Sequence, residues 1–147
     1  MKKITIELKT IGIIHSSYKN PTDVPKGKKE IISEIEIDKE LVNGLNDIDG
    51  FSHLHIFYWL HKSNSYSLTA HPPMDSKPHG LFATRSPHRP NPIAYSVVEL
   101  INRENNILYV KGLDAIEGTP VFDIKPYIEK SDCIIGSKSG WLENIKL

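Results

Sequence analysis

The sequence predicts a mostly β fold in which short antiparallel strands close into a small barrel or pack as a sandwich. Three observations support this fold class. Apolar and polar residues alternate with a period of two in several segments that are rich in β-branched residues. Glycine, proline, asparagine and aspartate stand between most of these segments, as turns require. No segment keeps an apolar period of about 3.6 residues over several turns, so we expect short helical turns only.

The first third of the chain contains strand patterns followed by one helical turn. Isoleucines alternate in 4–8 and recur in 11–16, so we expect an opening strand region with a break between the two. Segment 30–38 alternates well enough for a half-buried strand. Asp38 is an N-cap type of residue and Gly44 ends the following apolar pattern, so we expect a short helical turn between them.

The rest of the chain repeats this succession of strands and turns. Segment 51–61 is aromatic and apolar on both faces, as is typical of a central strand. The other expected elements are strands at Leu81–Thr84, 93–102, 107–112 and 121–127, a hairpin turn at Asn105–Asn106 and a turn at Glu117–Pro120. Hairpin turns join antiparallel neighbours, which favours the predicted sheet.

Size and composition predict a single domain that spans residues 1–147 and is soluble. The 18 Lys and Arg balance the 18 Asp and Glu, so a general attraction to nucleic acid is not expected and a polyanion has to meet a local patch. Cys133 is the only cysteine, which excludes an intramolecular disulfide. The N-terminus does not resemble a signal peptide, and no apolar run is long enough to cross a bilayer. We therefore expect a cytoplasmic protein without a membrane partner.

The segment 80–96 is the most informative part of the chain for function. It holds two arginines, a histidine and three prolines, and no acidic residue occurs from Ser76 to Val98. Proline restricts its own φ and the conformation of the residue before it, so the segment is stiff. A preordered cationic loop loses little entropy on binding an anion or a polar cofactor, and we expect it to form one wall of a cleft. The alternative is an exposed turn whose charges serve no ligand.

Four polar clusters at expected strand ends or in loops predict a binding pocket. Together they supply acids for a ribose or an amino group, cations for a carboxylate or a phosphate, and aromatic rings for stacking. Each cluster alone is also explained by turn capping or by core packing. The clusters are Val24–Gly27, Tyr58–Lys62, Thr84–Asn91 and Asp114–Lys125.

Other chemistries have weaker support in the sequence. His53 and His55 share one face of a strand, and His61 shares it if the strand stays regular, so a zinc site is an alternative. The cysteine and glutamate ligand patterns that accompany most such sites are missing, and we therefore expect no metal. Neither a G-x-x-x-x-G-K-[ST] loop nor a G-x-G-x-x-G motif occurs, so neither a phosphate loop nor a dinucleotide-binding fold is indicated.

Four ordered blocks of the chain resemble the TsaA-like family, which is also called TrmO or YaeB. The central block is Gly80-Leu-Phe-Ala-Thr-Arg-Ser-Pro-His-Arg-Pro-Asn-Pro-Ile, and it is long and unusual in composition. The other blocks are Ile11-Gly-Ile-Ile-His-Ser, Asp49-Gly-Phe-Ser-His-Leu and Gly118-Thr-Pro-Val-Phe-Asp-Ile-Lys-Pro-Tyr. The resemblance covers nearly the whole chain. One departure is Ala94, where the family block commonly carries glycine, and a different turn geometry is expected there.

The resemblance implies a methyltransferase that uses S-adenosylmethionine and is built on a β-barrel instead of a Rossmann-type sheet. The resemblance also implies a homodimer that methylates N6 of threonylcarbamoyladenosine at position 37 of certain tRNAs, in the anticodon loop. Two alternatives stay open at this point. One is a methyltransferase for another RNA or for a small substrate, and the other is a module that binds S-adenosylmethionine without catalysis.

The reaction that the resemblance implies suggests catalytic and RNA-binding residues, and the matching motifs suggest the residues that hold the cofactor. Tyr95 or His88 is the hypothetical proton acceptor, because N6 of a carbamoylated adenine is amide-like. Lys77 and Arg89 are expected to hold anticodon-loop phosphates. The residues expected to bind the cofactor are Pro25, Lys26, Gly27, His61, Lys62, Arg85, Tyr95, Asp114, Gly118, Thr119, Phe122, Asp123, Ile124 and Lys125.

Overall fold

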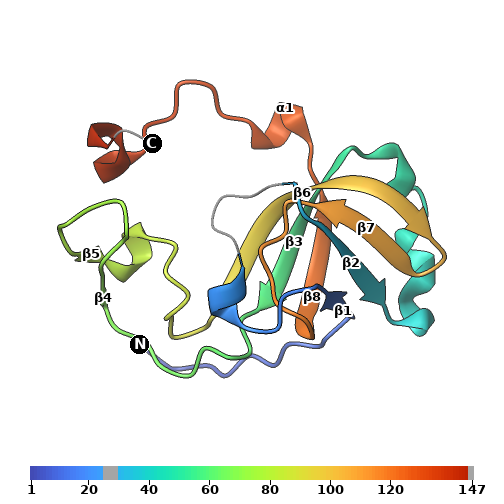
Figure 1. Ribbon diagram of the computed structural model, residues 1–147, viewed down its shortest axis with the longest axis horizontal. Coiled ribbons are helices and arrows are strands. Elements are labelled where there is room, and N and C mark those ends of the chain that lie inside the picture. The colour runs from blue at the N-terminus through green and yellow to red at the C-terminus, as the bar shows by residue number, and fades with distance from the viewer. Residues whose placement is uncertain (25–29, 146–147) are drawn as a thin grey trace.

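Strands that pair edge to edge close into an antiparallel barrel in the computed structural model, which describes residues 1–24 and 30–145 (Figure 1). Going around the barrel, the strand order is β1-β2-β7-β6-β3-β8, and β8 pairs again with β1. The barrel prediction is confirmed and the sandwich is excluded. The six strands are β1 (Gly12–His15), β2 (Ile32–Ile37), β3 (His53–Trp59), β6 (Ile93–Glu104), β7 (Ile107–Lys111) and β8 (Thr119–Pro126).

Side chains that alternate along each strand fill the inside of the barrel. In β3, Leu54, Ile56 and Tyr58 are buried while the residues between them face outward. The same period of two holds in β2, whose sequence Ile-Ser-Glu-Ile-Glu-Ile buries every second residue. The apolar residues that are almost fully buried in the barrel are Ile14, Ile35, Ile37, Leu54, Ile56, Val98, Leu108, Val110 and Val121.

The first strand approaches its neighbour so closely that only glycine fits. A Cβ atom built on Gly12 would lie 2.5 Å from the carbonyl oxygen of Glu36 and 3.0 Å from Cδ1 of Ile37. Gly12 pairs with Ile37 in β2 and with Val121 in β8, so its backbone is enclosed on both sides. The glycine therefore allows a tight barrel seam.

Short helices connect the strands, as the sequence predicts. The 3₁₀ helix Lys39–Leu45 (η2) begins after Asp38, whose side chain accepts a hydrogen bond from the backbone N–H of Glu40. The hairpin between β6 and β7 turns at Asn105, which has a φ of 56°, also as predicted. The other helices are η1 (Pro21–Asp23), η3 (Ile48–Gly50), η4 (Leu81–Ala83), α1 (Glu129–Asp132) and η5 (Gly140–Asn144).

A long excursion between β3 and β6 forms an arm that lies beside the barrel (Figure 1). It contains the two-stranded sheet of β4 (Thr69–Ala70) and β5 (His79–Gly80), followed by η4. The C-terminal segment leaves β8, forms α1 and reaches across to the arm, where the indole N–H of Trp141 donates to the carbonyl oxygen of Ala83 at 2.8 Å. The two ends of the C-terminal segment thus contact different parts of the molecule.

The strand predicted at 4–8 does not form. Residues 1–10 have no regular structure, and Ile4 is 82% exposed. Alternating isoleucines favour a strand only when a neighbouring edge supplies hydrogen bonds, and both edges of β1 are already taken by β2 and β8. The prediction is wrong because it used local pattern alone.

The strand predicted at Leu81–Thr84 is a 3₁₀ helix instead. The N–H and the hydroxyl of Thr84 both donate to the carbonyl oxygen of Leu81, at 3.0 and 2.8 Å, which closes a turn. Only Leu81 of this stretch is buried, and Phe82 is 78% exposed. Ala94, by contrast, lies inside β6 opposite Tyr58 and not in a turn, so the altered turn expected there does not exist.

Across the two described ranges, the longest helix has seven residues, and no helix has the length and apolar character that a bilayer crossing needs.

Candidate functional site

One end of the barrel gathers many of the residues that the sequence singled out. β3 and β7 end at this rim, while β6 and β8 begin there. The backbone N–H of Leu60 donates to Pro92 O at 2.9 Å, and that of Glu117 donates to Tyr18 O at 2.7 Å. At the rim, the connection after β3 is therefore held to the residues before β6, and the connection after β1 is held to the one before β8.

A buried tyrosine fixes one carboxylate at this rim. Tyr58 points into the barrel, and its hydroxyl donates to Oδ1 of Asp114 at 2.9 Å and lies 2.9 Å from Oγ of Ser96. Burial, together with the negative charge of Asp114, raises the pKa of Tyr58 well above its usual value. The hydroxyl therefore keeps its proton and remains a donor that orients the exposed Asp114.

The turn into β8 presents backbone to solvent. Gly118 has a φ of 82°, and a Cβ atom added there would meet nothing within 4 Å, so a ligand has open access to this backbone. Thr119 is buried, and its hydroxyl donates to Ile116 O at 2.7 Å. The side chain of Thr119 therefore stabilises the turn, while Gly118 leaves space beside it.

His61 and Lys62 are exposed in the turn that follows β3. The ammonium of Lys62 donates to Lys19 O at 3.2 Å, which brings it next to the connection after β1. His61 does not continue the face of His53 and His55, because β3 ends at Trp59. In the described part of the chain, no three His, Cys, Asp or Glu side chains come together as a metal site.

The segment 80–96, called the basic segment from here on, is braced by one of its own arginines. Nη1 of Arg89 donates to the carbonyl oxygens of Thr84 and Ser86, at 3.0 and 3.1 Å, and its guanidinium carbon lies 5.9 Å from the ring centre of Phe82. Ser63 donates to Pro87 O at 3.0 Å and so connects the segment to the rim. Proline stiffness was expected here, but the carbonyl contacts of Arg89 were not.

The remaining cationic candidates are on the surface. Arg85 and His88 of the basic segment are exposed, and so is Lys77, which lies between β4 and β5 on the arm. The backbone N–H of His88 donates to Oγ of Ser86 at 3.3 Å. The expected cofactor residues Pro25, Lys26 and Gly27 lie outside the described residues.

A second group of candidates lies on the outer face of β3, β6 and β8, next to the rim. Tyr95 packs against Phe57 with ring centres 5.4 Å apart, and Phe57 lies 6.5 Å from the ring of Phe122. Asp123 and Lys125 form an ion pair of 3.1 Å on the same strand. Ile124 is partly buried against the core, so it supports this surface from inside. The face therefore combines aromatic rings with one acid and one cation.

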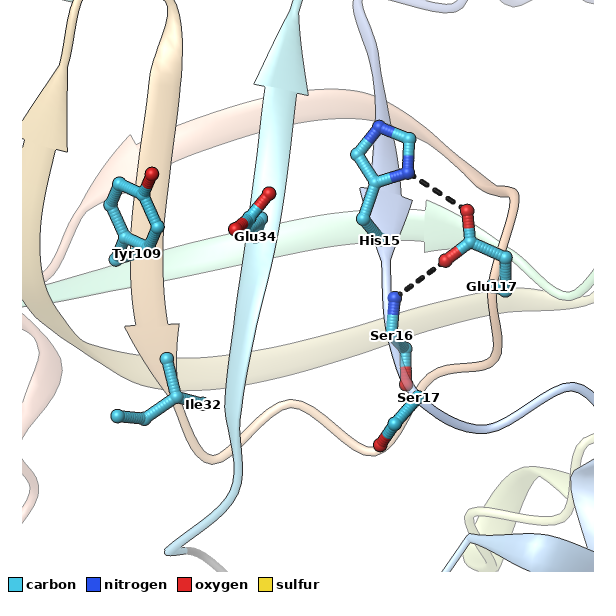
Figure 2. A pocket seen from close by; sticks show the side chains of 7 residues that line it. All are labelled: His15, Ser16, Ser17, Ile32, Glu34, Tyr109 and Glu117. Carbon is cyan, nitrogen blue, oxygen red and sulfur yellow. Dashed lines mark hydrogen bonds and ion pairs between the residues drawn. The ribbon is translucent and has the colours of Figure 1, made fainter.

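Two hollows are lined by other residues. One, of about 440 Å³, is lined by residues of β1, β2, β7 and the turn before β8, and Figure 2 shows it. In it, Glu117 accepts hydrogen bonds from His15 Nδ1 at 2.8 Å and from the Ser16 N–H at 2.7 Å. The other, of about 460 Å³, is beside α1. None of the residues expected to bind the cofactor, accept the proton or hold RNA lines either hollow, so neither of the two is the cleft expected beside the basic segment.

The comparison with known families decides the identity of this domain. Residues 13–133 match the model of the tRNA-methyltransferase O N-terminal domain. The chain belongs to the TrmO family. All candidate site residues of this chain fall within the matched range, including those at 25–27.

Individual TrmO-like proteins agree with this result. A probable S-adenosyl-L-methionine-binding protein of Archaeoglobus fulgidus is 50% identical, with 94% of this chain and 38% of that protein covered. The tRNA (adenine(37)-N6)-methyltransferase of Rattus norvegicus is 35% identical, with 83% and 31% covered. The crystal structure of TrmO from Pseudomonas aeruginosa superposes with a TM-score of 0.78 at 30% identity, with 93% and 62% covered. The chain thus spans less than two thirds of each of these proteins.

The sequence did not reveal that two residues of this TrmO domain form a hydrogen-bonded chain with Tyr95. His55 Nδ1 lies 2.8 Å from the Tyr95 hydroxyl, and His55 Nε2 lies 2.9 Å from Asp132 Oδ2. The sequence indicated His55 only as a weak zinc ligand. Asp132 is 77 residues away from His55 and carried no signal of its own, because the contact depends on where α1 folds.

Proposed function

We propose that this chain is a cytoplasmic methyltransferase that transfers the methyl group of S-adenosylmethionine to N6 of threonylcarbamoyladenosine at position 37 of tRNA. The observation that carries the proposal is that the TrmO domain match contains every candidate residue, and that the fold brings many of them to one rim and to the sheet face beside it. The names of the similar archaeal and mammalian proteins support the cofactor and the reaction respectively.

The residues at the rim fit the cofactor chemically. The carboxylate of the cofactor's amino acid part needs cationic partners, and Lys62 and Arg85 are candidates for this role. Ribose hydroxyls are donors that suit the oriented carboxylate of Asp114. Open space beside Gly118 and the rings of the outer face suit a nucleoside. When bound, the cofactor supplies an electrophilic methyl group on a positively charged sulfur.

The protein's own contribution to the reaction is positioning and proton removal. In-line alignment of an acceptor nitrogen with the methyl carbon supplies a large part of the acceleration, and a rigid barrel edge is suited to it. The nitrogen loses a proton as it is methylated, so a base belongs beside it. Tyr95 and His88 are the candidates, and Lys77 and Arg89 are proposed to contact phosphates of the anticodon loop, whose bases are single-stranded and accessible.

We also propose that the functional form is a homodimer. The single chain exposes apolar side chains on the arm and on the C-terminal segment, and Ile135 is 96% exposed. Exposed apolar residues gathered on two adjoining segments are typical of a protein contact. The two hollows described above are not lined by the residues proposed for the site, which fits a site that needs a second copy to wall it.

The cofactor is tested first, by calorimetric titration of the purified chain with S-adenosylmethionine. We expect binding, and an Arg85→Ala variant should bind about 5- to 150-fold more weakly if a charge-assisted hydrogen bond is lost, which corresponds to about 1–3 kcal/mol. Lys138→Ala, a cation on the C-terminal segment, is the matched control. No binding by the unaltered chain would reject the proposal, and an unchanged affinity of Arg85→Ala would reject only this residue's role.

The substrate is tested with tRNA from a strain that lacks the cognate gene. We expect the purified chain with labelled S-adenosylmethionine to methylate this tRNA, with the label in the threonylcarbamoyladenosine nucleoside after digestion. A second candidate function is favoured by the name of the archaeal relative at 50% identity, which describes binding only. Tight cofactor binding without transfer to any tRNA or small acceptor would support that non-catalytic module. Transfer to another nucleoside would support a different substrate.

A further inference from the structure

Tyr95, His55 and Asp132 form a continuous hydrogen-bonded chain across three elements. The Tyr95 hydroxyl on β6 lies 2.8 Å from His55 Nδ1 on β3. His55 Nε2 lies 2.9 Å from Asp132 Oδ2 on α1. In arrangements of this kind, the carboxylate orients the imidazole, and the imidazole acts as a base that takes the proton of the hydroxyl.

The direction of the hydrogen bonds follows from Asp132. Its Oδ2 also accepts the backbone N–H of Ile128 at 2.8 Å, and the hydrogen bond from His55, followed by that from Ile128, lowers the pKa of Asp132. An ionised carboxylate only accepts, so His55 carries its proton on Nε2. In the neutral ring Nδ1 is then an acceptor, and Tyr95 donates to it.

The surroundings keep the imidazole in this orientation. The imidazole stacks on the ring of Tyr95, with ring centres 5.4 Å apart and an interplanar angle of 23°. The centre of the Tyr127 ring also lies 5.4 Å from that of the imidazole. The side chain of His55 is 13% exposed. Lys125, which is opposite His55 in β8, is paired with Asp123, so its charge is partly compensated. Tyr95 itself is exposed and open to a substrate.

We infer that His55 and Asp132 are positioning residues that make Tyr95 the proton acceptor of the methyl transfer. The inference rests on the proposed function, and it favours Tyr95 over His88. Tyr95 has an ordered acceptor behind its hydroxyl, whereas His88 takes part in its hydrogen bond to Ser86 through the backbone N–H and not through the imidazole. Tyr95 also lies beside Phe57, whose ring adjoins the proposed cofactor residue Phe122.

The proposed step balances in atoms and charge. The bond from N6 to the methyl carbon forms while the bond from that carbon to sulfur breaks, and the electron pair stays on sulfur. The N6 proton passes to the Tyr95 oxygen as the Tyr95 hydroxyl proton passes to His55 Nδ1. The positive charge that was on the sulfonium is then on the imidazolium, where the carboxylate of Asp132 stabilises it.

Single-turnover methyl transfer at saturating cofactor and tRNA tests this role. We expect His55→Gln to lower the rate by about 10²-fold or more, with an unchanged dissociation constant for S-adenosylmethionine. Tyr95→Phe should lower the rate similarly, and the double variant should lose little more, because the two act as one unit. Asp132→Asn should give a smaller loss. His53→Gln, which removes the neighbouring histidine of the same outer face, should keep the wild-type rate.

The pH profile separates this role from a structural one. The pH dependence of the rate should differ in shape between the wild type and His55→Gln, because the variant has no imidazole behind Tyr95 to take up its hydroxyl proton. A rate lowered equally at every pH would show that His55 is merely structural, and it would overturn the inference.

Nuclear magnetic resonance of the nitrogen-labelled protein gives a readout that needs no activity. The Nε2-protonated tautomer of His55 is expected, and the Nδ1-protonated tautomer would overturn the inference. A wild-type protein that transfers no methyl group would reject the proposed function and the catalytic role together. An active wild-type protein with an equally active His55→Gln variant would reject the role of His55 and Asp132 and leave the proposed function standing.

Discussion

The indole ring of Trp141 lies flat against the imidazole of His79, with ring centres 4.1 Å apart and an interplanar angle of 16°. Trp141 also donates its Nε1 proton to Ala83 O at 2.8 Å, and Asp75 holds the other side of His79 through Nε2 at 2.7 Å. The C-terminal segment is therefore attached to the arm at its far end. The family match stops at residue 133, so Trp141 lies outside the matched range while His79 and Ala83 lie inside it.

We predict that Trp141→Ala loosens the arm without unfolding the barrel. Stacking and one hydrogen bond are lost at a partly exposed site, so the amide of Thr84 should exchange about tenfold faster with deuterium, which corresponds to about 1.4 kcal/mol. Amides of β3 and β6 should keep their protection. Ile135→Ala, which removes an exposed apolar residue of the same segment, is the control. Unchanged exchange at Thr84 would show that the contact does not stabilise the arm.

Gly12→Ala should destabilise the barrel. The added methyl group would overlap the Glu36 carbonyl and the backbone of Ile37, and backbone atoms at a paired seam have little freedom to move. We expect the free energy of unfolding to fall by about 1–3 kcal/mol in a urea titration. Gly44→Ala is the control, since its added Cβ meets nothing within 4 Å, and it should change stability by no more than about 0.5 kcal/mol.

The pair of His15 and Glu117 should make stability depend weakly on pH (Figure 2). The hydrogen bond to Glu117 raises the pKa of His15, and the same bond lowers the pKa of Glu117. The histidine's contribution is complete below its unfolded pKa of about 6.5 and is lost as pH rises through its raised folded pKa. The carboxylate's contribution is complete above its unfolded pKa of about 4.3 and is lost as pH falls.

We therefore expect the stabilisation by this pair to be greatest near pH 5.5. The difference in unfolding free energy between wild type and His15→Gln should be larger at pH 5.5 than at pH 8.5. Both side chains are about 40% exposed, so the difference should stay below about 1 kcal/mol. Denaturant titrations at the two pH values measure it, and a larger difference at pH 8.5 would contradict the assignment.

Tyr58→Phe should destabilise the protein at neutral pH and less so in strong base. Removal of the hydroxyl leaves Asp114 without its buried donor, which costs about 1–2 kcal/mol. The pKa of Tyr58 is raised in the folded protein, so wild-type stability should fall as pH rises above about 10, where the unfolded chain ionises. The Tyr58→Phe variant has no hydroxyl to ionise at this position, so it does not lose stability in this way. Unfolding titrations at pH 8 and 10.5 measure it, with the exposed Tyr66→Phe as control.

A strand could be predicted where apolar residues alternate in the sequence and neighbouring strands are available to pair with the segment. Segment 30–38 alternates in sequence and has β1 and β7 on its two sides, so β2 forms where expected. Segment 4–8 alternates as well, but its neighbouring edges are occupied, and no strand results. Leu81–Ala83 contains apolar residues of which one is buried, and a local turn closes there instead.

The site could be predicted as a set of residues but not as a geometry. The chain's own residues identified Asp114, Lys62 and the basic segment as candidates, because residue type and position at strand ends reveal available chemistry. The sequence did not reveal that Arg89 braces its own loop, since a guanidinium serves a carbonyl or a phosphate equally well before the backbone path is known.

What the sequence alone determined is the barrel class, the family and the residues available for chemistry, because alternation, turn residues and motifs are local and leave a direct record in the chain. Only the tertiary structure decided which side chains meet. Asp132 contacts His55 across 77 positions because the path of the chain after β8 places α1 beside β3. Such a contact depends on barrel closure and on the directions of distant strands, and no local pattern contains that information.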